Sequence, residues 1–245
     1  MTPSATHLVL IPAYNPGILL ESTVSAARSN WSPVWVQVDG STDGSHLRLP
    51  DGDTGDLEID IDPRNCGKGA AVLRGAQRAL KAGFTHALVM DADGQHPADR
   101  IKEFMEASAL NPSAAICGRP LFGPDAPLVR TLGRKLSVLM VSLETRGKGA
   151  QDPLFGFRVY PLEPLVRVLS GTGRGRRYDF DPEVAVRLAW AGVPALNQDA
   201  ACRYIRRDEG GVSHFHYVRD NLRMIAMHIR LIWILFLGKT GGRSA

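Results

Sequence analysis

Cysteine is scarce in this 245-residue sequence: its three cysteines, Cys66, Cys117 and Cys202, stand far apart and form no C-x-x-C pair. That spacing excludes a disulfide framework and a zinc cluster, and it is typical of a protein from a reducing compartment. A membrane-spanning helix needs roughly 20 apolar residues, whereas the longest apolar run covers only residues 231–237. The N-terminal apolar run breaks at Pro12 and has no basic flank, so we expect no signal peptide and a cytoplasmic protein.

Two nucleotide-binding motifs are also missing. The chain has neither the G-x-x-x-x-G-K-[ST] loop of a Walker-type NTPase nor a G-x-G-x-x-G after its first predicted strand. It has no lysine-rich tract, zinc finger or aromatic RNA-binding motif, so we expect no nucleic-acid partner.

The charge is uneven along the chain. The net charge is +4, yet residues 1–100 hold 8 basic and 12 acidic side chains, while residues 101–245 hold 21 basic and 13 acidic ones. An acidic half followed by a basic half favours a cation site that faces an anionic ligand. Phosphorylated small molecules and an anionic membrane surface are the partners that this distribution indicates.

Short apolar segments alternate with segments of helical periodicity through the first half. Strands are predicted at residues 7–12, 34–39, 57–62, 85–90 and 114–117, and helices at residues 18–29, 70–82 and 98–110. Such alternation predicts an α/β fold, with a mostly parallel central sheet and helices on both faces. No linker is visible, so we expect one domain over residues 1–215 and a C-terminal amphipathic helix over residues 216–245.

Polar residues follow the predicted strands, at the sheet edge where open parallel sheets bind ligands. The sharpest pair is Asp91 and Asp93, since two carboxylates at one strand end can bind one Mg²⁺ or Mn²⁺ ion beside a substrate phosphate. The alternative is an acidic turn that caps the helix after Pro97. Tyr14 can stack on a base and Asp39 can accept from a base N–H, or both are ordinary turn residues.

The second half of the chain alternates less regularly. The pattern predicts a helix over residues 128–144, a strand over residues 157–160 and a helix that starts with Asp181 as N-cap and Pro182 as first residue.

Basic residues gather on two of the predicted helices. Arg130, Arg134 and Lys135 either guide an anionic acceptor or form a solvated helix face. Spacings of four and seven residues place three arginines on one face of the C-terminal helix, which either lies on an anionic membrane or packs on protein. These three are Arg219, Arg223 and Arg230.

Seven motifs, taken in this order, resemble those of glycosyltransferase family 2. They are IPAYNP, VDGSTDGS, NCGKGAAVLRG, MDADGQHP, the CGR of residues 117–119, QDPLFGFRVYP and FDPE. Within that family the chain is similar to the dolichol- or polyprenyl-phosphate sugar synthases over residues 7–213. The resemblance implies the GT-A fold, a nucleoside-diphosphate sugar donor, a divalent cation and inversion at the anomeric carbon.

The resemblance also implies roles for residues on the donor side. The residues expected to bind the nucleotide sugar are Pro12, Ala13, Tyr14, Asn15, Asp39, Asn65, Lys68, Asp91, Ala92 and Arg119. Among them, Asp39 matches the aspartate that contacts the base, and Asn65 and Lys68 match the loop beside it. The expected metal ligands are Asp91, Asp93 and Gln95, and the expected ion is Mg²⁺ or Mn²⁺.

On the acceptor side, Asp152 matches the family's acceptor-side acid, and catalysis is assigned to Asp152 and Asp93. A hydroxyl acceptor needs a general base, which Asp152 would supply. A phosphate acceptor is already ionised and leaves Asp152 to orient arginines; a structural partnership with Arg158 is the third alternative. The expected contacts to an acceptor or its phosphate are Arg130, Arg134, Arg158 and His214.

Two positions depart from the family pattern. Val38 replaces the first of the two aspartates that usually precede the Gly-Ser turn. Where the lipid-phosphate synthases carry Arg-x-x-Gly-x-Ser-Lys, this chain has Arg207 and then Gly211-Val212-Ser213-His214.

The expected activity is sugar transfer from a UDP- or GDP-sugar to a lipid-linked or other amphipathic acceptor, by an enzyme peripheral to the inner face of the cell membrane. One alternative is a sugar nucleotidyltransferase, which the missing glycine-rich pyrophosphate loop disfavours. The other is a catalytically silent nucleotide-sugar-binding scaffold at the membrane, which the acids Asp91, Asp93 and Asp152 disfavour.

Overall fold

The structure, a computed structural model, describes residues 2–50, 55–122, 128–172, 175, 177–203, 205–212 and 216–238. Its strands are β1 (His7–Ala13), β2 (Val34–Asp39), β3 (Leu57–Asp62), β4 (His86–Val89), β5 (Ala115–Phe122), β6 (Arg158–Pro161) and β7 (Ala195–Cys202). Its α-helices are α1 (Leu19–Asn30), α2 (Lys68–Lys81), α3 (Ile101–Leu110), α4 (Leu128–Thr145), α5 (Leu162–Thr172), α6 (Phe180–Trp190) and α7 (Tyr217–Phe236).

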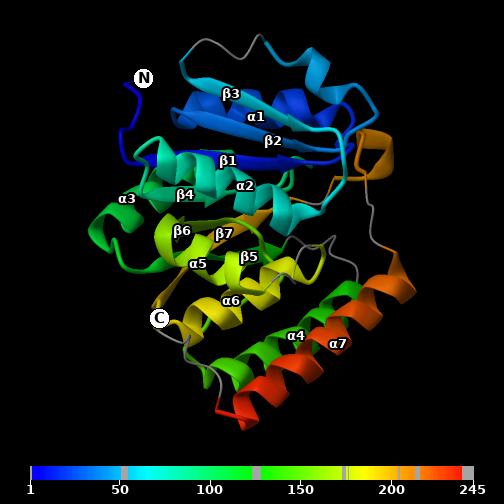
Figure 1. Cartoon of the computed structure of the whole chain (residues 1–245). Coiled ribbons are helices and arrows are strands. Elements are labelled where there is room, and N and C mark those ends of the chain that lie inside the picture. Colours follow the sequence, from blue (N-terminus) through cyan, green and yellow to red (C-terminus); the bar gives the residue numbers. More distant parts are fainter. Residues whose placement is uncertain are drawn as a thin grey trace.

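The strands form one seven-stranded sheet in the order β3-β2-β1-β4-β6-β5-β7 (Figure 1). Strand β6 runs antiparallel to β4 and β5, and every other neighbouring pair is parallel. The predicted α/β class with a mostly parallel sheet is therefore confirmed. Strand β7 was not predicted, because it is a half-exposed edge strand that contains Asn, Gln and Asp. Helix α5 was not predicted either.

Helices cover both faces of the sheet, which is why its inner strands are apolar on both sides. In β1, Val9 and Ile11 pack in the cluster that holds α1 and α3, while Leu8 and Leu10 pack in the cluster that holds α2, α5 and α6. At Gly75 in α2, a Cβ would lie 2.6 Å from the Leu10 side chain, so the glycine lets this helix approach β1 closely.

Helices α4 and α7 lie side by side outside α6 (Figure 1). Val141 of α4, Val186 of α6, and Met227 and Leu231 of α7 form a small buried cluster that joins the three helices. Helix α7 is thus held on the domain by one face. None of the helices in the described part of the chain is both long and apolar enough to cross a bilayer.

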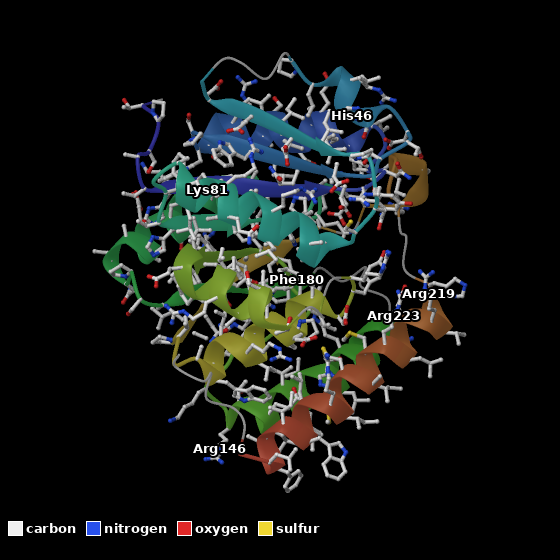
Figure 2. All side chains as sticks on the ribbon, in the orientation of Figure 1. His46, Lys81, Arg146, Phe180, Arg219 and Arg223 are labelled. Carbon is white, nitrogen blue, oxygen red and sulfur yellow. The ribbon has the colours of Figure 1, made fainter. Side chains whose placement is uncertain are left out.

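The three arginines predicted to share one face of α7 differ in their surroundings: 55% of the Arg219 side chain is exposed, 38% of Arg223 and 22% of Arg230. Arg223 pairs with Asp220 at 3.0 Å, Arg219 contacts the same carboxylate at 3.3 Å, and Arg230 pairs with Glu183 of α6 at 2.7 Å. Arg230 therefore points toward the domain, and Figure 2 shows Arg219 and Arg223 at the first turns of the helix. The side of α7 that is most exposed is apolar instead, as argued below.

Candidate active site

The loops after β1 and β2 are joined by the side chain of Asn15. Its Oδ1 accepts hydrogen bonds from the main-chain N–H groups of Thr42 at 2.7 Å and Asp43 at 3.3 Å. Asn15 adopts a positive φ of 43°, which lets its side chain bond the neighbouring loop. Of the other residues predicted to hold the nucleotide here, Pro12 and Ala13 are buried in β1, whereas Tyr14 is exposed.

Asp39, at the end of β2, holds the loop that leads into α2. Its carboxylate is buried and accepts from the N–H groups of Cys66 at 3.1 Å and Gly67 at 2.7 Å. A Cβ on Gly40 would lie 2.3 Å from the Asn65 nitrogen, so only glycine permits this close approach. The Asp39 carboxylate thus holds the predicted base-binding loop in place through two main-chain N–H groups. In the same loop, Asn65 Oδ1 accepts a hydrogen bond from Arg177 Nη1 at 3.0 Å.

Lys68 reaches away from that loop, which differs from its predicted place beside the base. Its Nζ lies 2.7 Å from Asp91 Oδ1 and 2.7 Å from Asp181 Oδ2. The prediction that Asp181 is the N-cap of α6 is wrong: Asp179 is the N-cap, and Asp181 lies inside the first turn with its carboxylate bound to Lys68.

Burial and charge shift the pKa values of this cluster. Burial alone would lower the pKa of Lys68, but Asp181 and Asp91 raise it above its ordinary value, so the ammonium stays charged. Burial would raise the pKa of Asp91, but Lys68 and then His96 hold it below its ordinary value. Burial, and next the charge of Asp91, raise the pKa of Asp93 to about 6. Three acids and one ammonium therefore share a poorly solvated site.

His96 supports the predicted metal loop as a neutral side chain. Its Nδ1 accepts from the main-chain N–H of Asp91 at 2.9 Å, and burial lowers its pKa to about 4. The Asp93 carboxylate accepts from the N–H of Gln95 at 3.1 Å, which turns the loop back on itself. The predicted metal residues are thus held by one short loop after β4.

These residues fit a divalent cation that is shared with a ligand. Burial first, and then the negative charge of Asp91, raise the pKa of Asp93, and a divalent ion would relieve the repulsion between the two carboxylates. The described residues contain no cluster of three or more His, Cys, Asp or Glu side chains arranged for a metal ion. Mg²⁺ is commonly held by one or two carboxylates together with substrate phosphates, so the donor set suits that ion.

Asp152 and Arg134 form the centre of the predicted acceptor side. Arg134 Nε donates to Asp152 Oδ2, and the N–H of Leu154 donates to Oδ1 at 3.0 Å. The Arg134 guanidinium also lies over the Phe122 ring, 4.8 Å from its centroid. Within the described residues, the buried Nη2 of Arg134 has no hydrogen-bond partner. Asp152 therefore orients an arginine that keeps one donor group available.

This pair lies at a groove of about 470 Å³ between α4 and the end of β5. Its lining is amphipathic and consists of Phe122, Arg134, Lys135, Val138, Leu139, Ser142 and Asp152. The side chain of Arg130, predicted to contact an acceptor, lies outside the described residues, as does His214.

Two further predicted arginines bond to residues beside or at Asp152: Arg119 donates to Gln151 Oε1 at 3.2 Å, and Arg158 donates to the Asp152 carbonyl. Arg158 is fully buried and donates to three oxygens, the Tyr160 hydroxyl at 3.2 Å and the main-chain carbonyls of Asp181 at 2.9 Å and Asp152 at 3.1 Å. The predicted contact of Arg158 with an acceptor is therefore wrong for this structure, because no part of it is exposed. Arg119 is exposed and pairs with Asp199 of β7.

The loop that holds Asp91 and Asp93 and the pair of Arg134 and Asp152 lie around a common region. Burial raises the pKa of Cys202 to about 11, and the charges that act on this thiol are Arg134, Asp93, Asp152 and Asp91. Burial likewise raises the pKa of Tyr178 to about 12, and the negative charges of Asp220, in the first turn of α7, and of Asp91 raise it further. The first turn of α7 therefore lies near the same site. Sequence reasoning missed both residues, because Cys202 ends β7, a strand that was not predicted, and Tyr178 lies in the turn before α6.

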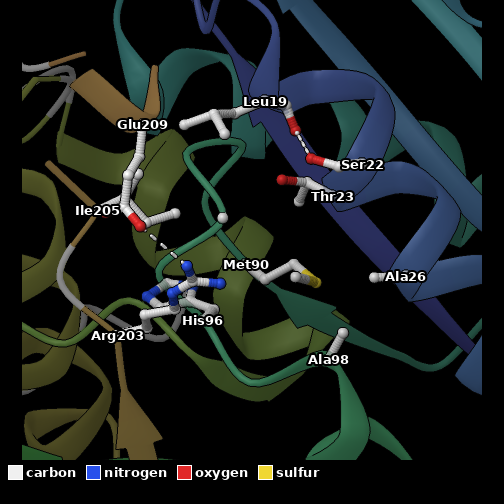
Figure 3. Close-up of a pocket in the computed structure, with 11 residues that line it drawn as sticks. Leu19, Ser22, Thr23, Ala26, Met90, His96, Ala98, Arg203, Ile205 and Glu209 are labelled. Carbon is white, nitrogen blue, oxygen red and sulfur yellow. Dashed lines mark hydrogen bonds and ion pairs between the residues drawn. The ribbon is translucent and has the colours of Figure 1, made fainter. Parts of the chain in front are cut away.

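A separate cavity of about 180 Å³ lies behind the metal loop (Figure 3). Leu19, Ser22 and Thr23 of α1 line one side, and Arg203 and Glu209, paired at 3.1 Å, close the other. Asp91 and Asp93 are not among its lining residues. This cavity is therefore distinct from the predicted donor site.

Comparison with known proteins identifies the family. The model of glycosyl transferase family 2 matches residues 8–179. This chain belongs to that family. It is therefore a glycosyltransferase rather than a sugar nucleotidyltransferase or a silent scaffold.

Two curated relatives in this family are lipid-phosphate sugar synthases by name. The chain is 28% identical over 203 residues to the polyprenol monophosphomannose synthase of Mycolicibacterium smegmatis, covering 78% of this chain and 73% of the relative. It is 24% identical over 197 residues to the UDP-N-acetylglucosamine–dolichyl-phosphate N-acetylglucosaminyltransferase of Methanococcus voltae, covering 73% of this chain and 78% of the relative.

Solved structures share the GT-A fold that the motifs implied. The chain matches glucosyl-3-phosphoglycerate synthase from Mycobacterium tuberculosis in complex with UDP, with a TM-score of 0.60 and 16% identity over 92% of this chain and 79% of that one. A complex of the same enzyme with Mn²⁺, UDP and glucosyl-3-phosphoglycerate gives a TM-score of 0.57 and 16% identity, covering 98% of this chain and 81% of that one.

Proposed function

We propose that this glycosyltransferase moves a sugar from a nucleoside-diphosphate sugar to a lipid-linked phosphate acceptor at a membrane surface. The observation that carries the proposal is Arg134, which Asp152 orients at an amphipathic groove next to the Asp91 and Asp93 loop. An arginine whose Nη2 has no partner among the described residues suits a phosphate, and the apolar walls suit a hydrocarbon chain.

The donor side is proposed to hold the diphosphate through Asp91 and Asp93 and a shared Mg²⁺ or Mn²⁺. Such an ion, when bound, stabilises the negative charge that develops on a departing diphosphate. Lys68 adds a permanent positive charge beside it, and Tyr14 and the loop held by Asp39 border the expected base site. The UDP and Mn²⁺ in the structures of the fold relatives support this assignment by analogy.

The acceptor side is proposed to need no general base. A phosphate oxygen is already ionised, so it can attack the anomeric carbon while the bond to the diphosphate oxygen breaks on the opposite face, which inverts the configuration. Both carboxylate oxygens of Asp152 are already bonded, one to Arg134 and one to the Leu154 N–H. This arrangement supports a positioning role for Asp152 rather than proton abstraction.

Membrane attachment is proposed to use α4 and α7 together. On α7, five of the exposed apolar side chains follow helical spacing and are 53–83% exposed: Leu222, Ile225, Ile229, Trp233 and Phe236. On α4, three leucines with the same spacing are 55–60% exposed: Leu136, Leu139 and Leu143. We call these eight residues the two-helix apolar face. Large apolar patches on a soluble surface mark contact sites, and helices of this kind lie in the membrane interface.

The charges around the two-helix apolar face favour an anionic membrane. Each helix contains one acidic residue, Glu144 in α4 and Asp220 in α7, and both are buried. The same two helices carry exposed basic residues: 55% of the Arg219 side chain is exposed, and Lys135 is exposed as well. Neither helix has an exposed acidic residue in its described part. Each basic residue near an anionic leaflet contributes about 1 kcal/mol to binding. We place this membrane on the cytoplasmic side, where the three free cysteines stay reduced.

The test is direct transfer with purified protein. UDP- and GDP-sugars with a labelled sugar are incubated with polyprenyl phosphate in anionic vesicles and Mn²⁺, and label is measured in the organic phase after extraction. The proposal expects label from one donor class, lost with EDTA and with Asp93→Ala. Transfer to 3-phosphoglycerate or another soluble phosphate, with none to the lipid, would contradict the lipid acceptor.

A further inference from the structure

Lys68 stands where a cation would bind the first aspartate of the predicted metal pair. Its Nζ lies 2.7 Å from Asp91 Oδ1, within direct ion-pair distance. The lysine is the first residue of α2, and its side chain is 20% exposed. An oxygen that already binds an ammonium at this distance cannot take a divalent ion without bringing two cations together, which electrostatics opposes.

Asp181 gives the ammonium a second anchor. Its Oδ2 lies 2.7 Å from Lys68 Nζ, while its buried Oδ1 has no hydrogen-bond partner within the described residues. The cluster fits because residue 156 is glycine: a Cβ there would lie 2.6 Å from Lys68 Nζ and 3.3 Å from Asp181 Oδ1. Lys68 can therefore leave Asp91 and still remain bound to Asp181.

We propose that Lys68 is a built-in counter-cation that competes with the metal ion for Asp91 and makes metal binding depend on the nucleotide diphosphate. Without nucleotide, the ammonium neutralises Asp91 and disfavours the metal. A bound diphosphate brings negative charge that attracts the ammonium and supplies oxygen ligands, so the metal gains ligands as Lys68 shifts. Asp181 is the positioning residue that keeps the ammonium in the site. The inference rests on the proposed donor site, and it explains why a lysine lies between two acids there.

The experiment measures Mn²⁺ binding by electron paramagnetic resonance, without nucleotide and with saturating UDP or GDP. Coupling between bound ligands is commonly 5–150-fold. We therefore expect Lys68→Met to bind Mn²⁺ about tenfold more tightly than the unmodified protein when nucleotide is absent, with a smaller difference when it is present. Lys68→Arg keeps the charge and should restore weak binding. Lys81→Met, at the exposed far end of α2 (Figure 2), is the matched control and should change nothing.

Asp181→Asn tests the anchor. If Asp181 draws Lys68 away from Asp91, its loss leaves the ammonium on Asp91, so Asp181→Asn should weaken Mn²⁺ binding. The same substitution should have little effect in the Lys68→Met background. Melting temperatures of each variant establish that it is folded, and Lys68→Gln replaces Lys68→Met if the latter does not fold. Lys68→Met that binds Mn²⁺ no more tightly than the unmodified protein, with nucleotide binding intact, would overturn the inference and leave the proposed function standing. Absence of both Mn²⁺ and nucleotide binding in every variant would overturn both.

Discussion

The Nδ1 of His228 in α7 lies 2.8 Å from the Oε1 of Glu144 in α4, and both side chains are buried. The main-chain carbonyl of the same glutamate accepts from Trp190 Nε1 of α6, also at 2.8 Å. One residue therefore ties α4 and α7, the two helices that carry the two-helix apolar face, to each other and to α6. The position of that face relative to the active site depends on this buried polar contact.

Glu144→Ala should loosen α7. The substitution leaves a buried histidine nitrogen without its partner, which costs about 1–3 kcal/mol in the free energy of unfolding. Urea denaturation measures the loss, and hydrogen exchange should show faster exchange in α7 than in α2. Glu163→Ala, which removes an exposed ion pair with Arg167, is the control and should cost less than about 0.5 kcal/mol. An equal loss in both variants would argue against a special role for the Glu144 contact.

Gly156→Ala should impair the donor site while sparing stability. The new Cβ would lie 2.6 Å from Lys68 Nζ and 3.2 Å from Asp91 Oδ2, so the flexible lysine end must move. We expect nucleotide affinity in the presence of Mn²⁺, measured by isothermal titration calorimetry, to fall about tenfold, since one displaced charge contact is worth roughly 1.4 kcal/mol. Gly171→Ala in α5, where a Cβ would meet open space, is the matched control. Unchanged nucleotide affinity would mean that Lys68 does not act in the donor site.

Much of the fold follows from local pattern. The five predicted strands of the first half and the helices between them are present because both faces of the sheet are covered, which makes each inner strand a continuous apolar run. The edge strand β7 has polar residues along its length and offers no such run. Its position depends on pairing with β5, a long-range contact that no local window contains.

The site could be predicted only in part, because some of its contacts join residues that are far apart in the sequence. Asp91 and Asp93 stand at a strand end, where topology alone predicts ligands. The partners of Lys68 could not be predicted, because Asp181 is separated from it by 113 residues and meets it only when α6 packs beside α2. Arg158 illustrates the opposite error: we expected it to contact an acceptor, but its side chain is fully buried and donates to two main-chain carbonyls.

Asp152→Asn distinguishes a positioning role from proton abstraction. The amide cannot hold Arg134 as an anion does, so we expect the KM for a phosphate acceptor to rise about tenfold, the loss typical of one charge-assisted hydrogen bond. The KM for the sugar nucleotide and the shape of the pH profile should not change. Steady-state kinetics with each substrate varied in turn gives these values. A fall in kcat of a hundredfold or more with loss of the acidic limb of the pH profile would instead identify Asp152 as a general base.

Stability should decline in mild acid because of His7. Burial, and next the charge of His86, lower the pKa of His7 from its ordinary 6.5 to about 4. Between these values the unfolded chain binds a proton at this position that the folded chain does not, so His7 lowers the free energy of unfolding as pH drops, by at most about 1.4 kcal/mol per pH unit. Buried His96, whose pKa is also about 4, adds a decline of the same sign. The double variant His7→Phe with Ser108→Ala removes the titrating group and its buried partner together. Urea titrations from pH 7 to pH 4 should show a shallower slope for it; an identical slope would assign the effect to other groups.

Trp233→Ser and Ile229→Ser should each weaken binding to anionic vesicles. Both side chains lie on the two-helix apolar face and are 63% and 54% exposed, so neither supports the core. Removing a large apolar side chain from the interface costs about 2 kcal/mol, which corresponds to a loss in affinity of about tenfold or more. Sedimentation with sucrose-loaded vesicles measures this, and salt should weaken binding because part of it is electrostatic. Leu110→Ser, at the 82% exposed end of α3, controls for the loss of any exposed leucine. If all three variants bind like the unmodified protein, the membrane does not contact this face.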